Sequence, residues 1–89
     1  MFEKNKPKEQ RKEGIEGKQV IVITRSYTDG GNMYYNEIIG EVVKFKNQFL
    51  ILKNCEFRAY KNNEIVEKKF IQRNLWIHTH IIAFIQELD

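Results

Sequence analysis

Two histidines lie two positions apart in one of the most apolar stretches of the chain. His78 and His80 belong to the sequence NLWIHTHIIAFI, which covers residues 74–85. Imidazole groups bind metals, transfer protons and donate hydrogen bonds, so three kinds of chemistry are open to this pair. If the segment is a continuous strand, both side chains lie on the same face of it.

Metal binding and catalysis both need partners that the sequence does not supply. A zinc site normally has three or four protein ligands, and the chain has two histidines and one distant cysteine, Cys55. No nucleophile or orienting acid lies near the pair, and no recognised catalytic motif occurs elsewhere. We therefore expect no metal, no other cofactor and no enzymatic activity. Two roles remain open, hydrogen bonding to the backbone at a turn and membership of a binding pocket.

Length and composition indicate one small folded domain. The chain has 89 residues, of which 42% are hydrophobic, too many for a wholly disordered protein. A single cysteine cannot form an intrachain disulfide and favours a reducing, cytoplasmic setting. The apolar run at residues 81–85 is too short to cross a bilayer, so we expect no contact with the membrane interior.

Basic residues are concentrated at the N-terminus. Residues 1–13 contain five basic and three acidic side chains, which gives +2 of the total net charge of +3. Such a segment attracts phosphates, although the interspersed acids also fit a plain solvated terminus. A short helix is expected over residues 8–13, after Pro7. We divide the chain into a tail, residues 1–14, and a folded domain, residues 15–89.

The folded domain reads as strands separated by turns. The five predicted strands cover residues 18–27, 33–45, 49–55, 65–77 and 80–88. Residues 56–60 extend the third strand or follow it. The first strand leads into Asp-Gly-Gly-Asn, a sequence typical of a hairpin turn. Gly40 interrupts the second strand and indicates a bulge or a sharp bend.

This pattern predicts an all-β fold, a small and strongly bent five-stranded open barrel. The last strand is apolar on both faces, which is unexpected for the outer strand of a monomer. Pairing with a second copy through Ile81, Ile82 and Phe84 would cover it, and a head-to-tail pairing that closes makes a ring. Coverage by a loop or by the N-terminal segment of the same chain is the alternative.

Three stretches of the sequence resemble the Sm/Lsm/Hfq superfamily of small bent barrels. They are GKQVIVI, GEVVKFKNQFLILKNCE and NLWIHTHIIAFI, within residues 15–86. Shared features are Gly17-Lys18 before a Val-x-Val strand, Gly40 at the start of the bent strand, and Phe45 before a short loop. LILKN resembles the LLKN of the Hfq branch, and THIIAF places His80 on a histidine of that branch. The resemblance implies an Sm-like barrel.

For function, the resemblance implies an oligomeric ring that binds single-stranded, U-rich or A-rich RNA. In such rings a base is held by the loop before the third strand and by the junction of the last two strands. The matching positions here are Lys46, Asn47, Gln48 and Phe49 in the loop, and His78, Thr79 and His80 at the junction. Rings stack on bases, amides read base edges, and cationic groups reach phosphates.

A divergent barrel used for protein–protein contact, without a nucleotide pocket, is the alternative function. Lys46 stands where Sm sequences have an aspartate, and His78-Thr79 stands where they have Arg-Gly. Residues 15–89 carry ten basic and nine acidic side chains, so the domain is almost neutral. These features favour the alternative, whereas the basic tail and the charge of Lys46 favour RNA.

Other aromatic residues have roles that the sequence leaves open. The first long loop and its borders contain Tyr27, Tyr34 and Tyr35. These rings either provide an additional stacking surface or pack over the end of the barrel. We expect Trp76 to be a packing residue or a subunit contact rather than a base stacker. Lys68, Lys69 and Arg73 either follow a phosphate backbone or form a solvated strand face.

Overall fold

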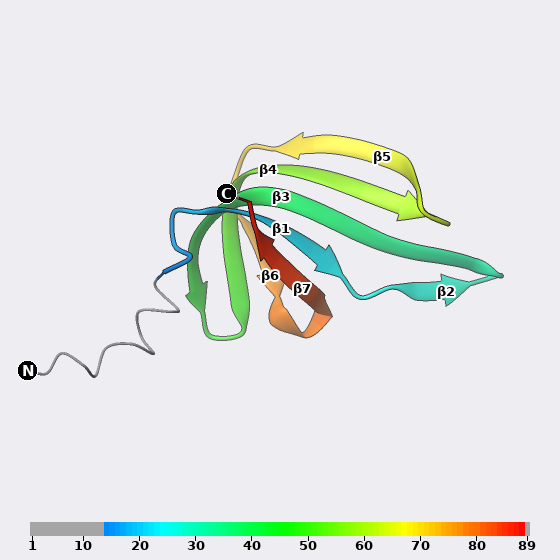
Figure 1. The fold of residues 1–89 in the computed structure, drawn as a ribbon, viewed down its shortest axis with the longest axis horizontal. Coiled ribbons are helices and arrows are strands. Elements are labelled where there is room, and N and C mark those ends of the chain that lie inside the picture. The colour runs from blue at the N-terminus through cyan, green and yellow to red at the C-terminus, as the bar shows by residue number, and fades with distance from the viewer. Residues whose placement is uncertain (1–13, 89) are drawn as a thin grey trace, which may run out of the picture.

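The described part of the chain, residues 14–88, is one antiparallel β-sheet (Figure 1). In this computed structural model the elements are β1 (Gln19–Thr24), β2 (Tyr27–Asp29), β3 (Asn32–Lys46), β4 (Phe49–Lys61), β5 (Glu64–Ile71), β6 (Leu75–His78), a 3-10 helix (Thr79–Ile81) and β7 (Ile82–Glu87). The strand order is β5-β4-β3-β1-β7, with β2 paired to β3 and β6 paired to β4. The predicted all-β class is confirmed, and the helix expected over residues 8–13 lies outside the described residues.

Two of the five predicted strands are each divided in two. The predicted strand 18–27 separates into β1 and β2 after Thr24, and the predicted strand 65–77 separates into β5 and β6 at residues 72–74. The partner strand stays the same across each break, β3 for the first pair and β4 for the second. β2 pairs with the start of β3, away from β1, while β5 and β6 pair with opposite ends of β4. The result is seven strands.

A sharp bend in β3 lies at Gly40, as the sequence predicts. The register between β3 and β4 shifts between Ile39 and Glu41, which marks an irregularity in the ladder at this position. A Cβ atom on Gly40 would lie 2.9 Å from the Cys55 Sγ and 3.2 Å from the Lys53 carbonyl oxygen. The two strands therefore approach closely because residue 40 has no side chain. Figure 1 shows β3 and β4 bending together in this region.

The hydrophobic core fills the inner side of this bend. Eight buried residues form one cluster, with contributions from β1, β3, β4 and β6: Val20, Val22, Ile38, Val42, Leu50, Leu52, Cys55 and Ile77. Val20, Val22, Leu50 and Leu52 are fully buried. Burial of each such side chain contributes about 1.5–3 kcal/mol, so this cluster dominates the stability of the fold.

The sheet is curved but not closed into a barrel. β5 and β6 lie at one side of the sheet and β7 at the other, and no strand pairing joins them within residues 14–88. The connection between β6 and β7 is the 3-10 helix. Both sides of this opening therefore carry backbone groups without a ladder partner in the described chain.

Beyond the core, four strands continue as a projection that we call the arm, residues 27–37 and 56–68 (Figure 1). No arm residue is buried. Two tyrosine pairs stack on it, Tyr27 on Tyr34 and Tyr35 on Tyr60, with ring centroids 5.2 Å and 4.8 Å apart. The tyrosines thus pack with one another on the arm and not over the core.

Polar contacts complete the arm. The Arg58 guanidinium donates hydrogen bonds to the carboxylates of Glu56 at 2.8 Å and Glu37 at 3.1 Å, and the Tyr60 hydroxyl donates to Glu37 at 2.9 Å. At the tip, Gly30 and Gly31 adopt positive φ angles of 62° and 85°, as the tight turn between β2 and β3 requires.

Candidate nucleic-acid interface

Residues of the two segments predicted to bind RNA lie side by side. The pairing of β6 with β4 sets Phe49 directly opposite His78. The Thr79 amide donates a hydrogen bond to the Gln48 carbonyl oxygen at 2.8 Å, which ties the β3–β4 turn to the 3-10 helix. Asn47 takes the left-handed conformation in this turn, with φ of 57°, a conformation that asparagine tolerates. Residues about thirty positions apart thus form one surface.

Four rings and one ammonium group make up this surface, which we call the end cluster: Lys46, Phe49, Trp76, His78 and His80. The Phe49 ring centroid lies 5.6 Å from that of Trp76 and 5.2 Å from that of His78, in tilted and edge-on geometries. The rings of His78 and His80 are 6.0 Å apart. Such edge contacts hold the rings in defined orientations.

Lys46 brings a positive charge to the end cluster. Its Nζ lies 5.7 Å from the centroid of the Trp76 ring, within the range of a cation–π contact. Lys46 forms no ion pair of 4.0 Å or less with an acidic group in residues 14–88. The ammonium is therefore available to a phosphate, and the indole holds it beside the other rings.

His78 has a defined role in the turn and a free ring nitrogen. Its Nδ1 accepts a hydrogen bond from the His80 amide at 3.0 Å and caps the 3-10 helix. A neutral imidazole that accepts at Nδ1 carries its proton on Nε2. His78 therefore has an N–H donor at Nε2 in addition to the acceptor used in the turn. The two roles that the sequence left open, turn capping and pocket membership, are compatible in this one residue.

Trp76, which the sequence predicted to be a packing residue or a subunit contact, belongs to the end cluster. Its ring is half exposed and contacts Phe49 and Lys46. The available signal was the two-residue spacing from His78, because alternate residues of a strand share a face. By contrast, Asn47, Gln48 and Thr79 contribute mainly backbone geometry: they are exposed, and no side-chain hydrogen bond of theirs to residues 14–88 is present.

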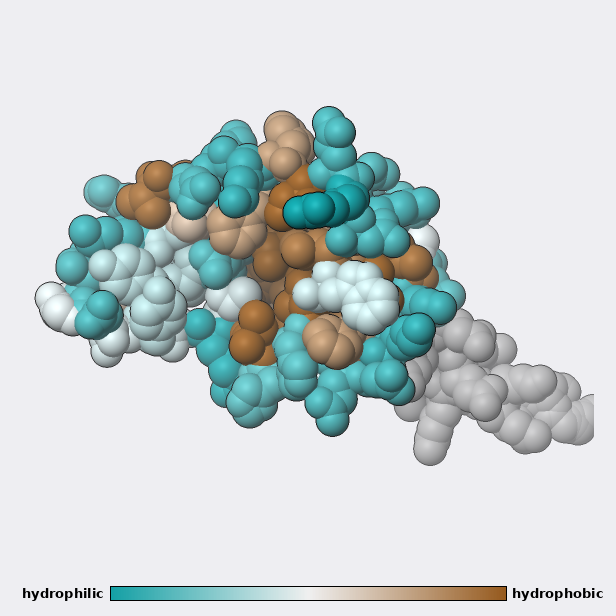
Figure 2. All heavy atoms as spheres, turned by 180° about the vertical axis from the view of Figure 1, so that it is seen from behind, coloured by the Kyte–Doolittle hydropathy of each residue, from teal (hydrophilic) through white to brown (hydrophobic). Residues whose placement is uncertain are grey.

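An open groove of about 440 Å³ runs beside the end cluster. Apolar side chains from four strands and the 3-10 helix line most of it: Ile38, Phe57, Ile71, Leu75, Ile77 and Ile81. Phe49, Trp76 and His78 lie at the groove as well. Apolar residues also gather in the middle of the face seen in Figure 2, bordered by hydrophilic ones. A concave apolar site of this size suits a flat organic group.

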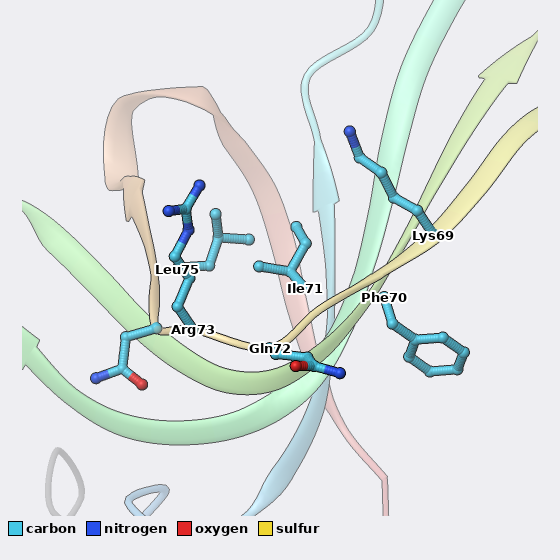
Figure 3. Close-up of a pocket in the computed structure, with 7 residues that line it drawn as sticks. Lys69, Phe70, Ile71, Gln72, Arg73 and Leu75 are labelled. Atoms are coloured by element: carbon cyan, nitrogen blue, oxygen red, sulfur yellow. The ribbon is translucent and has the colours of Figure 1, made fainter.

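A second hollow of about 490 Å³ follows the loop between β5 and β6 (Figure 3). Ile71 and Leu75 lie on one side of this chain segment, while Phe70 points away from them. Of the two cations that line it, Lys69 lies 3.7 Å from Glu67, while Arg73 forms no ion pair with an acidic group of residues 14–88. This hollow lacks the convergence of rings and charge found at the end cluster.

The residues predicted to form a subunit interface lie in and beside β7. Ile81 and Phe84 are half exposed, at 47% and 55%, whereas Ile82 is partly buried and packs against the core. One edge of β7 pairs with β1, and its other edge has no strand partner in residues 14–88.

Comparisons with protein-family models, with curated proteins and with solved structures give no match to this chain. Among residues 14–88 no three histidine, cysteine or acidic side chains are grouped so that they hold a metal ion. The described residues also include no helix of the length and apolarity that a bilayer span needs.

Proposed function

We propose that this protein binds single-stranded RNA at the end cluster, as an Sm-like open barrel that assembles into an oligomeric ring and catalyses no reaction. The observation that carries the proposal is the pairing of Phe49 with His78, which joins the two segments named by the Sm/Lsm/Hfq resemblance. The bend at Gly40 and the short loop after Phe45 are the other features of that resemblance that fit the geometry.

The chemistry of the end cluster matches an unpaired base and its phosphate. Phe49 and Trp76 present aromatic rings on which a base stacks, and stacking of this kind is tolerant of sequence. The Nε2–H of His78 reaches a base carbonyl or a phosphate oxygen, and Lys46 adds the charge. Bases of a duplex are already stacked and do not have faces free for such contacts. The preference is therefore for single strands.

Ring assembly is supported by the two open sides of the sheet. β7, with Ile81 and Phe84 exposed, and β5 are complementary in that each has one edge without a ladder partner in the described residues. Pairing between the two in neighbouring copies is head-to-tail, and such contacts form rings when they close. Light scattering after size exclusion is then expected to give several times the chain mass of 10.7 kDa.

RNA binding is tested by titrating labelled oligo-U and oligo-A at about 50 mM and about 200 mM salt. Phe49→Ala removes a stacking ring, and the expected loss is about 1–3 kcal/mol, or about 5- to 150-fold in affinity. Lys46→Ala is expected to reduce the salt dependence, while Lys44→Ala, an exposed lysine of the same strand, serves as its control.

Phe70→Ala is the control for Phe49→Ala, because Phe70 is 73% exposed, does not line the groove, and points away from Ile71 and Leu75, which do (Figure 3). Oligomeric mass is measured for every variant, since β5 also borders the opening of the sheet. Absence of binding at the lower salt, or equal losses in the Phe49 and Phe70 variants, would contradict the proposal.

A protein-interaction module is the second candidate, favoured by the apolar groove and the almost neutral domain. In that case the wild-type protein has no measurable affinity for either oligonucleotide at low salt.

A further inference from the structure

Arg25 connects the end cluster to the arm. Its amide donates a hydrogen bond to the Ile81 carbonyl oxygen at 2.8 Å, and its Nε donates to the His80 carbonyl oxygen, also at 2.8 Å. These two bonds fix the backbone and the guanidinium against the 3-10 helix. No acidic group in residues 14–88 lies within 4.0 Å of the guanidinium. The terminal nitrogens of Arg25 therefore remain available beside His80.

Two residues further along the chain, Tyr27 offers an open aromatic face. The ring of Tyr34, directly opposite in the β2–β3 ladder, stacks against it with planes inclined by 23°. Tyr27 is nevertheless 61% exposed, because only one face of its ring is covered by this partner. A ring that is oriented by a neighbour and open on its other side loses little freedom on binding a flat group.

A second cation lies next to this tyrosine pair. Lys61 of β4 stands directly opposite Tyr34 of β3, and residues directly opposite in an antiparallel pair share a face of the sheet. Lys61 is exposed and forms no ion pair with an acidic group of residues 14–88. Arg25 thus lies two residues before Tyr27 in the chain, and Lys61 lies opposite Tyr34 in the ladder.

We propose that Arg25 and Tyr27, supported by Tyr34 and Lys61, form a second binding station for the same RNA strand. This inference rests on the proposed function, since the strand reaches the arm from the end cluster past His80. Arg25 and Lys61 contact phosphates, and a base stacks on the open face of Tyr27. The protein then takes single strands long enough to span both stations.

The acidic residue at the tip sets the outer limit of this station. Asp29 lies two residues beyond Tyr27 on the same face of β2, and its carboxylate repels phosphates there. The strand therefore leaves the arm before the tip.

The test is a comparison of oligo-U chains of about 5 and about 15 nucleotides, which bracket the site sizes of small single-strand-binding barrels. In Tyr27→Ala, affinity for the long chain is expected to fall about 5- to 50-fold and affinity for the short chain less than about twofold. Tyr27→Phe keeps the ring and retains binding. Thr28→Ala, the neighbouring exposed residue on the other face of β2, is the control.

Arg25→Gln keeps a hydrogen-bond donor for the His80 carbonyl but removes the charge. Its expected effect is a weaker salt dependence for the long chain alone. If wild-type protein binds both chains equally and Tyr27→Ala changes neither, the second station does not exist while RNA binding at the end cluster stands. Equal losses for both chains in Tyr27→Ala also overturn the second station. Failure of wild-type protein to bind either chain removes the proposed function and this inference together.

Discussion

The bent half of the sheet and the arm are held together by different forces. In the bent half, fully buried aliphatic side chains such as Val22 and Leu52 pack against one another around the close approach at Gly40. The arm buries no residue and relies on stacked tyrosines and on the ion pairs of Arg58. Burial is worth more than exposed ion pairs, so the bent half carries most of the stability.

The two proposed binding sites lie on regions of different stability. The end cluster lies on strands that also contribute to the core: β4 supplies both Phe49 and the buried Leu50. Its rings are thus positioned by a rigid frame. The second station lies on a region with few buried contacts, where local opening costs less free energy. We therefore expect a preformed primary site and a more mobile secondary one.

The largest expected effect comes from Gly40→Ala. The added Cβ lies 2.9 Å from the Cys55 Sγ, and that side chain is fully buried, so it has little room to move. Overpacking of this kind costs about 1–3 kcal/mol of unfolding free energy. Urea denaturation followed by circular dichroism measures the loss.

A double-mutant cycle with Cys55→Ala sharpens this prediction. Removal of the sulfur relieves its contact with the new methyl group. The double variant should therefore lose less unfolding free energy than the two single variants lose in sum. Additive losses would indicate that the Lys53 carbonyl oxygen, 3.2 Å from the Cβ position, and not the thiol sets the limit.

The sequence predicted the strands well and their divisions poorly. Alternating apolar residues and turn residues indicated every strand region, and Gly40 marked the bend correctly. The breaks at residues 25–26 and 72–74 carry no glycine or proline. The strands on either side of each break pair with the same neighbour, β3 at the first break and β4 at the second, so each break is a local irregularity in one ladder that depends on a strand distant in the sequence.

The sequence predicted only some residues of the candidate site, because contacts between distant parts of the chain bring the site together. Loop residues and histidines were named from the resemblance, and the ladder of β4 with β6 brings them together. Trp76 was predicted to be a packing residue or a subunit contact, because large aromatic side chains dominate small cores and interfaces. Arg25 was missed altogether, since its contact with the His80 carbonyl joins positions far apart in the chain.

A medium effect is expected from Tyr35→Ala on the arm. The variant removes the stack on Tyr60, and such pairs contribute about 0.5–1.5 kcal/mol. Amide hydrogen exchange is expected to become faster in residues 32–37 and 57–61, while amides of the core strands keep their rates. Val66→Ala, a truncation of an exposed arm side chain, is the control. Equal acceleration in the core would mean that the two regions open as one unit, and the contrast between them would fail.

The smallest expected effect is a loss of folding stability at low pH. The Arg58 guanidinium, which hydrogen-bonds the Glu56 carboxylate, holds the pKa of that carboxyl below its ordinary value of 4.5. The unfolded chain therefore binds a proton at higher pH than the folded one, and the stabilisation is complete above pH 4.5 and is lost as the pH falls through the folded pKa. Water reaches the pair and screens it, so the effect is modest.

Denaturation midpoints at neutral pH and at about pH 3 measure this contribution. Wild-type protein is expected to exceed Glu56→Gln in stability at neutral pH, and the difference should shrink in acid. Glu64→Gln is the control, because its carboxylate pairs with no basic group of residues 14–88. A difference that stays constant with pH would assign the role of Glu56 to packing. The arm would then depend on its tyrosine stacks and on the bonds that Glu37 accepts from Arg58 and Tyr60.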